Sequence, residues 1–235
     1  MIIPITIWPK HMINCFVIKA DKGLVLVDTG VPGSSKKIFQ EIENHGYKPS
    51  DIQLIVVTHG HMDHFGSVGE INQKLQVPVL GHLKDTPFFE KGEANVDSMK
   101  PNKLWAYLFK RAVKSLRTIP FRPNIIMDGE EYDLGDWIAG AKILHTPGHT
   151  AGSISVILPN NEAIIMDMMA TGVGLGGVMM HSRVKHPAFH DNLIQLKRSF
   201  DKILQYDLDR FYLGHGKPVN RKQVLRYLKK LHYIS

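Results

Sequence analysis

One short segment constrains this chain more than any other feature of its sequence. A run of four apolar residues, LIVV, leads directly into THGHMDH at residues 58–64, and a compact apolar run of this kind predicts a buried strand. Residues two apart in an extended segment point the same way, so His59 and His61 can reach one metal ion from a single face. Asp63 and His64 can then hold a second ion. The alternative is a His-rich surface loop.

Two more histidines lie in loops that follow predicted strands. His149 occurs in TPGHTAG and His215 in GHG. Either one alone is compatible with a turn residue or a hydrogen-bonding surface group. Together they supply the third His that one ion needs and the additional His that the other needs, so the separate motifs have one explanation.

Two carboxylates end apolar strands. Asp167 follows AIIM, and Asp28 occurs in VDTG. Asp167 either begins a loop or bridges two ions roughly 3.5 to 4 Å apart, since a carboxylate has two oxygens. Asp28 is either a turn carboxylate or an acceptor that orients a ligand His.

Patterns typical of strands and helices cover much of the rest of the chain. Apolar patterning predicts strands at 2–7, 13–19, 24–28, 54–57, 77–81, 125–127, 142–145, 153–158, 163–166 and 210–213, and helices at 35–44, 67–75, 102–117, 187–204 and 222–231. Each half therefore contains strands followed by helices, which predicts two stacked sheets with helices outside. Without an internal repeat or a linker-like stretch, we expect one domain over 1–235 with a helical insert at about 84–121.

Composition and targeting signals narrow the functional classes. With 43% hydrophobic and 22% charged residues, the chain is an ordinary globular protein. The single Cys15 excludes an internal disulfide and favours a reducing compartment, and we expect a buried thiol there. We find no signal-peptide pattern and no apolar run long enough for a transmembrane segment, so the expected location is cytoplasmic. The net charge of +7 is compatible with acidic substrates, nucleic acid or an anionic membrane.

The order of these motifs resembles a known family. NCFVI, VDTG, THGHMDH, TPGHTAGS, the strand-end Asp and GHG together look like the metallo-β-lactamase superfamily, over about residues 13–216. The resemblance implies an α+β fold, the four-layer αββα sandwich, with a dinuclear centre at one edge. It implies that one ion is held by His59, His61 and His149, that the other is held by Asp63, His64 and His215, and that Asp167 bridges them. Two Zn²⁺ ions suit these ligands, and iron or manganese is also possible.

Within the superfamily, the chain resembles the non-lactamase hydrolases. The complete HxHxDH motif includes Asp63, and the implied ligands include no Cys. Hydrolases of the glyoxalase II type share two of the motifs but carry a C-terminal helical domain that binds glutathione, which we do not expect from residues 217–235. The acyl-homoserine lactonases have a Tyr where this chain has Ala170. Met166 stands where much of the superfamily has Gly.

The predicted function is that of a metal-dependent hydrolase. A metal-bridged hydroxide would attack a small ester, lactone or thioester, with Asp63 as the catalytic residue that orients the hydroxide or moves its proton. The alternatives are a phosphodiester or nucleic-acid hydrolase, which the charge favours, and an iron-dependent oxidoreductase such as a persulfide dioxygenase, which shares much of the ligand pattern. We expect a small-molecule substrate, no dedicated nucleic-acid module, and a monomer or homodimer.

Two segments are candidates for substrate selection. The loop at 171–185, rich in Gly and Met, is either a flexible lip or a plain surface connection. The basic helix at 102–117 either presents a solvated charged face or serves as a lid that attracts anions or contacts a membrane.

Overall fold

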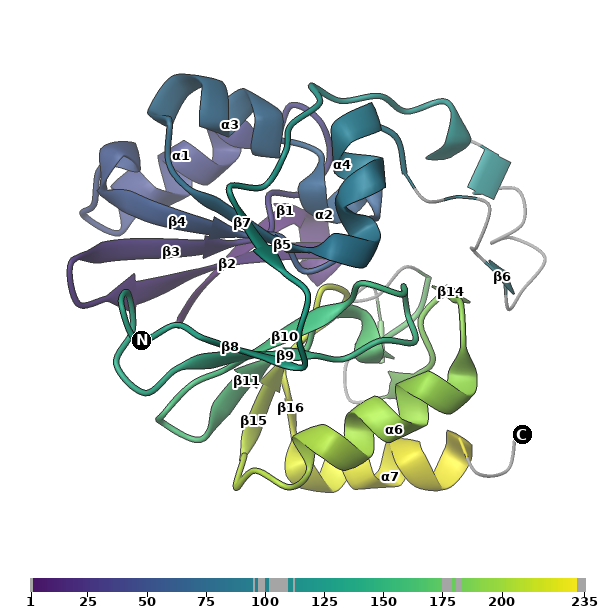
Figure 1. Cartoon of the computed structure of the whole chain (residues 1–235). Coiled ribbons are helices and arrows are strands. Elements are labelled where there is room, and N and C mark those ends of the chain that lie inside the picture. Colours follow the sequence, from purple (N-terminus) through teal and green to yellow (C-terminus); the bar gives the residue numbers. More distant parts are fainter. Residues whose placement is uncertain are drawn as a thin grey trace.

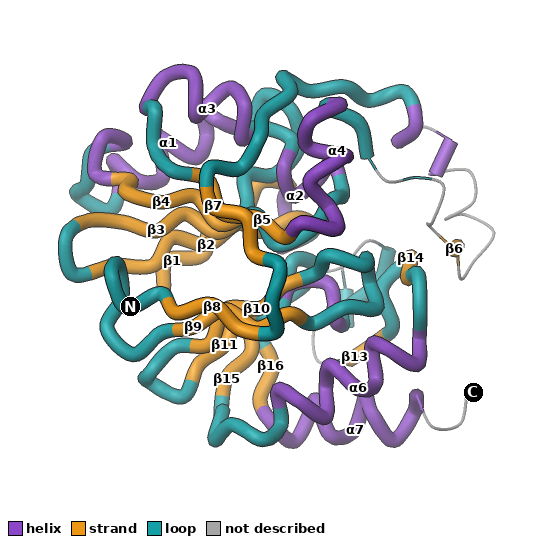
Figure 2. Tube along the Cα trace, in the orientation of Figure 1, coloured by secondary structure: helices purple, strands orange, loops and turns teal. Residues whose placement is uncertain are grey.

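Two six-stranded sheets face each other, and helices cover the outer face of each (Figure 1). The computed structural model describes residues 2–94, 96, 100–101, 110–111, 113–174, 179–180 and 183–231. α1 and α3 lie on one side of the molecule and α6 and α7 on the other, with the two layers of strands between them (Figure 2). This arrangement confirms the predicted αββα sandwich.

The first sheet has the order β1-β2-β3-β4-β5-β7. Its strands are β1 (Ile2–Trp8), β2 (Ile13–Ala20), β3 (Gly23–Val27), β4 (Ile52–Val56), β5 (Val79–His82) and β7 (Ile125–Met127). β1, β2 and β3 pair antiparallel, whereas β3, β4, β5 and β7 pair parallel. Parallel strands place their carboxyl ends at the same edge of the sheet, so the loops after β3, β4 and β5 lie together.

The second sheet has the order β16-β15-β11-β10-β9-β8. Its strands are β8 (Glu131–Asp133), β9 (Lys142–His145), β10 (Ile154–Ile157), β11 (Glu162–Ile164), β15 (Arg210–Tyr212) and β16 (Val219–Asn220). β11 and β15 are parallel, so the residues after these two strands also meet at one edge. Two short pairs complete the strands, β6 (Lys100–Pro101) with β14 (Phe189–His190) and β12 (Ala170–Thr171) with β13 (Val184–Lys185).

The helices lie outside the sheets because their apolar faces pack there. They are α1 (Ser35–Asn44), α2 (Met62–Phe65), α3 (Val68–Leu75), α4 (Thr86–Lys91), α6 (Leu193–Ile203) and α7 (Arg221–Leu231). Side chains alternate along β3, so Leu24 and Leu26 belong to the same core as Ile38 of α1. Val25 and Val27 instead belong to the core between the sheets. A third core packs α6 and α7 against the second sheet.

Several elements differ from the sequence predictions. The helix expected from residue 187 begins at Leu193, because Asn192 caps it and residues 189–190 pair as β14. The short strands β8 and β16 and the one-turn helix α2 were not predicted. The basic helix expected at 102–117 lies largely outside the described residues, and so does the middle of the loop at 171–185. Cys15 is a buried free thiol, as expected.

Within the described part of the chain, no helix combines the length and the apolar character that crossing a membrane requires.

Candidate metal centre

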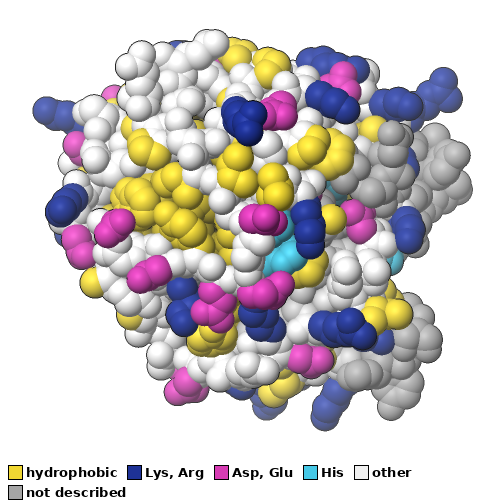
Figure 3. Space-filling model, viewed as in Figure 1, with side chains coloured by type: hydrophobic (Ala, Val, Ile, Leu, Met, Phe, Trp, Pro, Cys, Tyr) yellow, Lys and Arg dark blue, Asp and Glu magenta, His cyan; other side chains and the backbone are white. Residues whose placement is uncertain are grey.

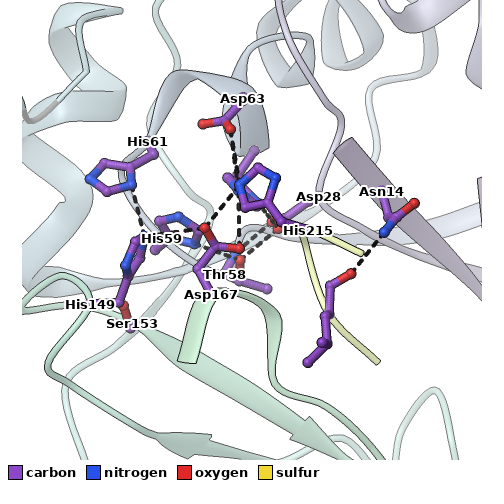
Figure 4. Close-up of polar contacts among 12 residues, drawn as sticks. Asn14, Asp28, Thr58, His59, His61, Asp63, His149, Ser153, Asp167 and His215 are labelled. Atoms are coloured by element: carbon purple, nitrogen blue, oxygen red, sulfur yellow. Dashed lines mark hydrogen bonds and ion pairs between the residues drawn. The ribbon is translucent and has the colours of Figure 1, made fainter. Parts of the chain in front are cut away.

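The predicted ligand residues come from strand ends of both sheets. Residues 58–64 follow β4, where the chain runs extended as far as His61 and then turns into α2. His149 lies in the turn between β9 and β10, Asp167 in the 3-10 turn after β11, and His215 after β15. Segments distant in the sequence therefore meet at one edge of the sandwich (Figure 4).

Among the described residues, ligand-type side chains form three groups, of which one, Asp28 with His59 and His64, shares a histidine with each of the other two. His59, His61 and His149 each offer a nitrogen, and these atoms lie within 4.8 Å of one another. The same is true of ligand atoms from Asp63, His64 and His215. We call these groups the first triad and the second triad. They match the two ligand sets that the family resemblance implies.

Asp167 lies between the two triads. Its Oδ2 is 3.4 Å from Nε2 of His149 in the first triad and 3.0 Å from Nε2 of His215 in the second, and its Oδ1 is 3.6 Å from Nε2 of His64. Figure 4 shows the carboxylate between the rings of His149 and His215. A side chain in this position can contact ions held by both triads.

Several buried polar atoms of this cluster are of the kind that bind metal ions. Nε2 of His59, His61 and His64 and Oδ1 of Asp167 are buried, and none of them has a hydrogen-bond partner among the described residues. Leaving a buried donor or acceptor unsatisfied costs roughly 1–3 kcal/mol each. Divalent transition metals accept this combination of imidazole nitrogen and carboxylate oxygen. The donor set therefore suits a metal ion.

Contacts at Nδ1 orient the imidazoles of three of these histidines. Nδ1 of His149 donates to the Phe189 carbonyl at 2.9 Å, and Nδ1 of His215 donates to the Met12 carbonyl. Nδ1 of His59 is 3.1 Å from Oγ1 of Thr58. With Nδ1 engaged in this way, Nε2 is the atom that faces the cluster, and Nε2 of His149 lies 2.9 Å from Nδ1 of His61.

Asp28 holds the ring of His64. Its Oδ2 lies 2.8 Å from Nδ1 of His64, and the backbone N–H and the hydroxyl of Thr58 donate to the same carboxylate at 2.8 and 2.6 Å. Both Asp28 and His64 are fully buried. Of the two roles considered for Asp28, the geometry matches the acceptor that orients a ligand His.

Burial and mutual charge set the protonation states of the cluster. Burial first, and then neighbouring imidazoles, hold the pKa of His59 well below its usual value, and burial lowers the pKa of His61 to about 4 and of His149 to about 3. The first triad is therefore neutral at pH 7, the state in which His binds metals.

The second triad behaves differently because carboxylates surround it. Burial opposes protonation of His64, but Asp167, Asp63 and Asp28 outweigh it and raise the pKa of His64 to about 9. The pKa of His215 is also raised, against burial, chiefly by Asp167. Burial likewise opposes ionisation of Asp63 and Asp167, yet the adjacent imidazoles hold both pKa values well below the usual range.

One residue that joins the ligand loops was not predicted from the sequence. Asp85, completely buried after β5, accepts hydrogen bonds from the Gly60 N–H at 2.8 Å, the Thr150 hydroxyl at 2.6 Å and the Gly152 N–H at 3.1 Å. It therefore ties the loop of His59 and His61 to the loop of His149. The signal was a carboxylate just beyond a strand, the same signal that drew attention to Asp28 and Asp167.

Backbone details around Asp167 also bear on the cluster. Met166 has φ +41, a left-handed conformation that costs a non-glycine residue free energy. This conformation gives a physical reason for glycine to be common at that position in the superfamily. A Cβ added at Gly214 would lie 2.2 Å from Oδ1 of Asp167, so the backbone approaches the carboxylate too closely for any side chain.

A cavity of about 390 Å³ opens beside the cluster. His61, Asp63, His149, Asp167 and His215 line one side of it, and most of the other described lining residues are apolar. The volume lies in the range of small-molecule sites. Members of both triads and Asp167 are thus accessible from one cavity, as a hydrolytic metal site requires.

Comparisons with known proteins agree with this geometry. The family model described as the metallo-beta-lactamase superfamily matches residues 8–215. The chain is 28% identical to "Probable metallo-hydrolase MJ0888" of Methanocaldococcus jannaschii over 221 residues, which cover 92% of this chain and 93% of that protein. It is 29% identical to "Hydroxyacylglutathione hydrolase GloC" of Haemophilus influenzae over 166 residues, 66% of this chain and 64% of that protein.

A solved structure shares the fold. TTHA1623, described in a di-iron-bound form, superposes with a TM-score of 0.67 at 24% identity, covering 95% of this chain and 97% of that one. The family model, the sandwich of two sheets and the strand-end His and Asp cluster lead to one conclusion. This chain belongs to the metallo-beta-lactamase superfamily.

Proposed function

We propose that this protein is a dinuclear metal-dependent hydrolase of a carboxylic ester, lactone or thioester. The observation that carries the proposal is the buried cluster of two triads around Asp167, with unpartnered ligand atoms beside an open cavity. The relative named as a hydroxyacylglutathione hydrolase supports acyl transfer to water as the reaction class.

The first triad would hold one ion, the second triad the other, and Asp167 both. Zinc is the metal that we propose, because neutral imidazoles with ionised carboxylates suit it. Iron and manganese accept the same ligands, and TTHA1623 is described with two irons. Bound divalent ions supply a Lewis acid and lower the pKa of water, so that a hydroxide nucleophile is available near pH 7.

We assign the proton transfer to Asp63. Its side chain is 25% exposed and lines the cavity, whereas Asp167 is only 4% exposed. Asp63 is also ionised, because the pKa is held low by His64 and His215 against the effect of burial. It can therefore accept a hydrogen bond from the attacking water, orient it toward the carbonyl carbon and pass a proton to the leaving group.

The two alternative functions are a phosphodiester or nucleic-acid hydrolase and an iron-dependent oxidoreductase, and the experiment below distinguishes both from the proposed function. On the face drawn in Figure 3, Lys and Arg side chains are interspersed with Asp and Glu, which is unlike the basic tract of a nucleic-acid surface. An iron oxidoreductase would need the same ligands, so metal identity and oxygen consumption distinguish it.

Metal analysis coupled to a substrate panel tests the proposal. Protein purified without added metal should hold about two equivalents of zinc. It should hydrolyse activated esters, lactones or thioesters, lose this activity with a chelator and regain it with zinc. Less than one equivalent of any transition metal, with no uptake on reconstitution, would overturn the metal site. Phosphodiester cleavage that exceeds every acyl substrate, or iron with oxygen consumption on a persulfide, would replace the hydrolase assignment.

Substitution of Asp63 tests the assigned role directly. Asp63→Ala should abolish turnover and weaken metal binding while the protein remains folded by circular dichroism. Asp136→Ala is the matched control, because Asp136 is exposed in the turn between β8 and β9. Full activity of metal-loaded Asp63→Ala would contradict the role.

A further inference from the structure

We infer that the cavity beside the ligand cluster is an acyl-group site that binds a neutral, apolar substituent next to the scissile carbonyl. The preferred substrates are then esters or thioesters with an aliphatic chain or ring, in place of acetyl esters, phosphodiesters or anionic acyl groups. This inference rests on the proposed hydrolase function and specifies its substrate class.

The cavity has two chemically different sides. The polar side consists of the candidate ligand residues, which Figure 4 shows close together. Much of the other side is apolar and comes from several parts of the fold: Trp8 at the end of β1, Ile13 of β2, Val31 after β3, Leu116, and Phe189 of β14. A carbonyl at the polar side therefore places its substituent against apolar carbon.

Two large apolar side chains of this wall are open to solvent. Trp8 is 37% exposed and Leu116 is 40% exposed, whereas Ile13 and Phe189 of the same lining are buried. Covering exposed apolar surface is favourable by about 25 cal/mol per Å². An apolar substituent in the cavity would remove both water-exposed side chains from solvent and would complete the packing over the buried ones.

The apolar part of the cavity offers few hydrogen-bond donors to an anionic substituent. Outside the ligand cluster, Arg117 is the one basic side chain among the described lining residues, and its Nε lies 3.1 Å from Oε1 of Glu93. Its Nη1 donates to the carbonyls of Lys114 and Leu116 at 2.8 and 2.9 Å. Nε and Nη1 of this guanidinium are therefore already engaged. A phosphate or carboxylate in the apolar part would lack the paired donors that such groups need.

The size of the cavity sets a limit on the chain length. Binding should improve about fourfold for each added methylene. The improvement should end when the cavity is filled.

A substrate series on the metal-loaded protein tests the inference. p-Nitrophenyl esters from acetyl to decanoyl should show kcat/KM rising by about fourfold per methylene and then levelling. A second series of activated acetate esters with growing alcohol groups identifies the side of the carbonyl that occupies the cavity. A chain-length dependence confined to the acyl series supports the inference, and one confined to the alcohol series, or absent from both, overturns it.

Variants of the exposed wall connect the preference to this cavity. Leu116→Ala should lower the octanoyl-to-acetyl ratio of kcat/KM by about fivefold, and Trp8→Ala should lower it further because more apolar area is removed. Ile194→Ala is the matched control, since Ile194 is exposed on α6 and does not line the cavity. Unchanged ratios in both wall variants would overturn the assignment.

A binding measurement separates this inference from the hydrolase proposal. Calorimetric titration of the metal-loaded protein with straight-chain alkyl methyl ketones, from acetone to 2-decanone, requires no turnover. Affinity that rises with chain length and is reduced by Leu116→Ala, without hydrolysis of any acyl substrate, would support the apolar site and refute the proposed reaction. Hydrolysis without chain-length dependence in rate or affinity would refute the apolar site alone.

Discussion

At the scale of single residues, Asp85 is a buried carboxylate that connects the loops carrying the candidate ligands. Burial raises the pKa of Asp85, and the hydrogen bonds from Thr150, Gly60 and Gly152 oppose that effect. Each of these donors lies next to a predicted ligand in the chain or within three residues of one. Positions of the ligand loops relative to each other therefore depend on this one side chain.

Asp85→Asn should weaken metal binding by about 10 to 100-fold, the usual cost of losing a residue that supports ligands. One amide group replaces an acceptor, so at least one of the three donors would face another donor. Competition with a chromophoric chelator measures the affinity, and Asp136→Asn serves as the exposed control. Equal affinities for Asp85→Asn and the unsubstituted protein would show that the loops hold their positions without Asp85.

Protonation of the second triad predicts a pH dependence for the metal-free protein. The pKa of His64 is raised to about 9 by Asp167, Asp63 and Asp28 in spite of burial, and the pKa of His215 is raised as well. A raised His pKa stabilises the fold below the unfolded value near 6.5, and this contribution is lost as the pH rises through the folded value. The lowered pKa values of the first triad affect the stability of the fold only below pH 6.5, where these histidines are protonated in the unfolded chain.

The Tm of metal-free protein should therefore fall between pH 6.5 and 9, while metal affinity should rise over the same interval because the ligands release protons. Thermal unfolding and chelator competition at several pH values measure the two trends. A metal-free Tm that rises across this interval would contradict the assigned protonation of the second triad.

At the scale of elements, the site depends on how closely the loop after β15 approaches the turn after β11. Gly214 has no positive φ, so its requirement is purely steric. Its missing Cβ leaves room for Oδ1 of Asp167 and for Cε1 of His64, which would lie 2.2 and 2.7 Å away. Gly129, between β7 and β8, has only the Glu131 carbonyl near its Cβ position, at 3.8 Å.

Gly214→Ala should lower the free energy of unfolding by about 1–3 kcal/mol, the range for overpacking a buried position. It should also reduce metal affinity at least tenfold, because Asp167 or His64 must move. Urea unfolding and chelator competition measure these effects. Gly129→Ala should change neither quantity appreciably. An equal effect of the two substitutions would mean that the close approach does not constrain the cluster.

At the scale of the whole molecule, the candidate metal ligands come from both sheets. The first sheet contributes His59, His61, Asp63 and His64 through the loop after β4, and the second sheet contributes His149, Asp167 and His215. The unfolded chain does not hold these groups together, so metal binding should stabilise the native state alone.

Removing the metal should lower Tm by about 10 °C. Ligand linkage at a free metal concentration of about 1,000 times Kd is worth about 4 kcal/mol, and this energy corresponds to a shift of that size in a chain of 235 residues. Differential scanning calorimetry before and after chelation measures it. Zinc should restore the Tm of the chelated protein, and Asp63→Ala should show a smaller shift. An unchanged Tm in protein that has lost its metal would refute this stabilisation.

The sequence by itself determined the strands near the site and the ligand-type residues at their ends. Strand patterns and the spacing within THGHMDH are local properties, because two residues separated by one share a face of an extended chain. The family resemblance then predicted the grouping of the two triads, and the structure brings the same side chains together. The predicted start of α6 was wrong because residues 189–190 form β14 and Asn192 caps the helix, so pairing with a distant strand outweighed the local helical pattern.

Only the tertiary structure decided which residues support the ligands and which apolar side chains line the cavity. Asp85 meets Gly60 and Thr150 through chain separations of 25 and 65 residues. Trp8 and Leu116 resemble core residues in the sequence but remain partly exposed beside the ligands. The hydrophobicity of a side chain predicts that it will be buried but does not predict which surface will cover it. That choice depends on the packing of both sheets, which local sequence patterns do not specify.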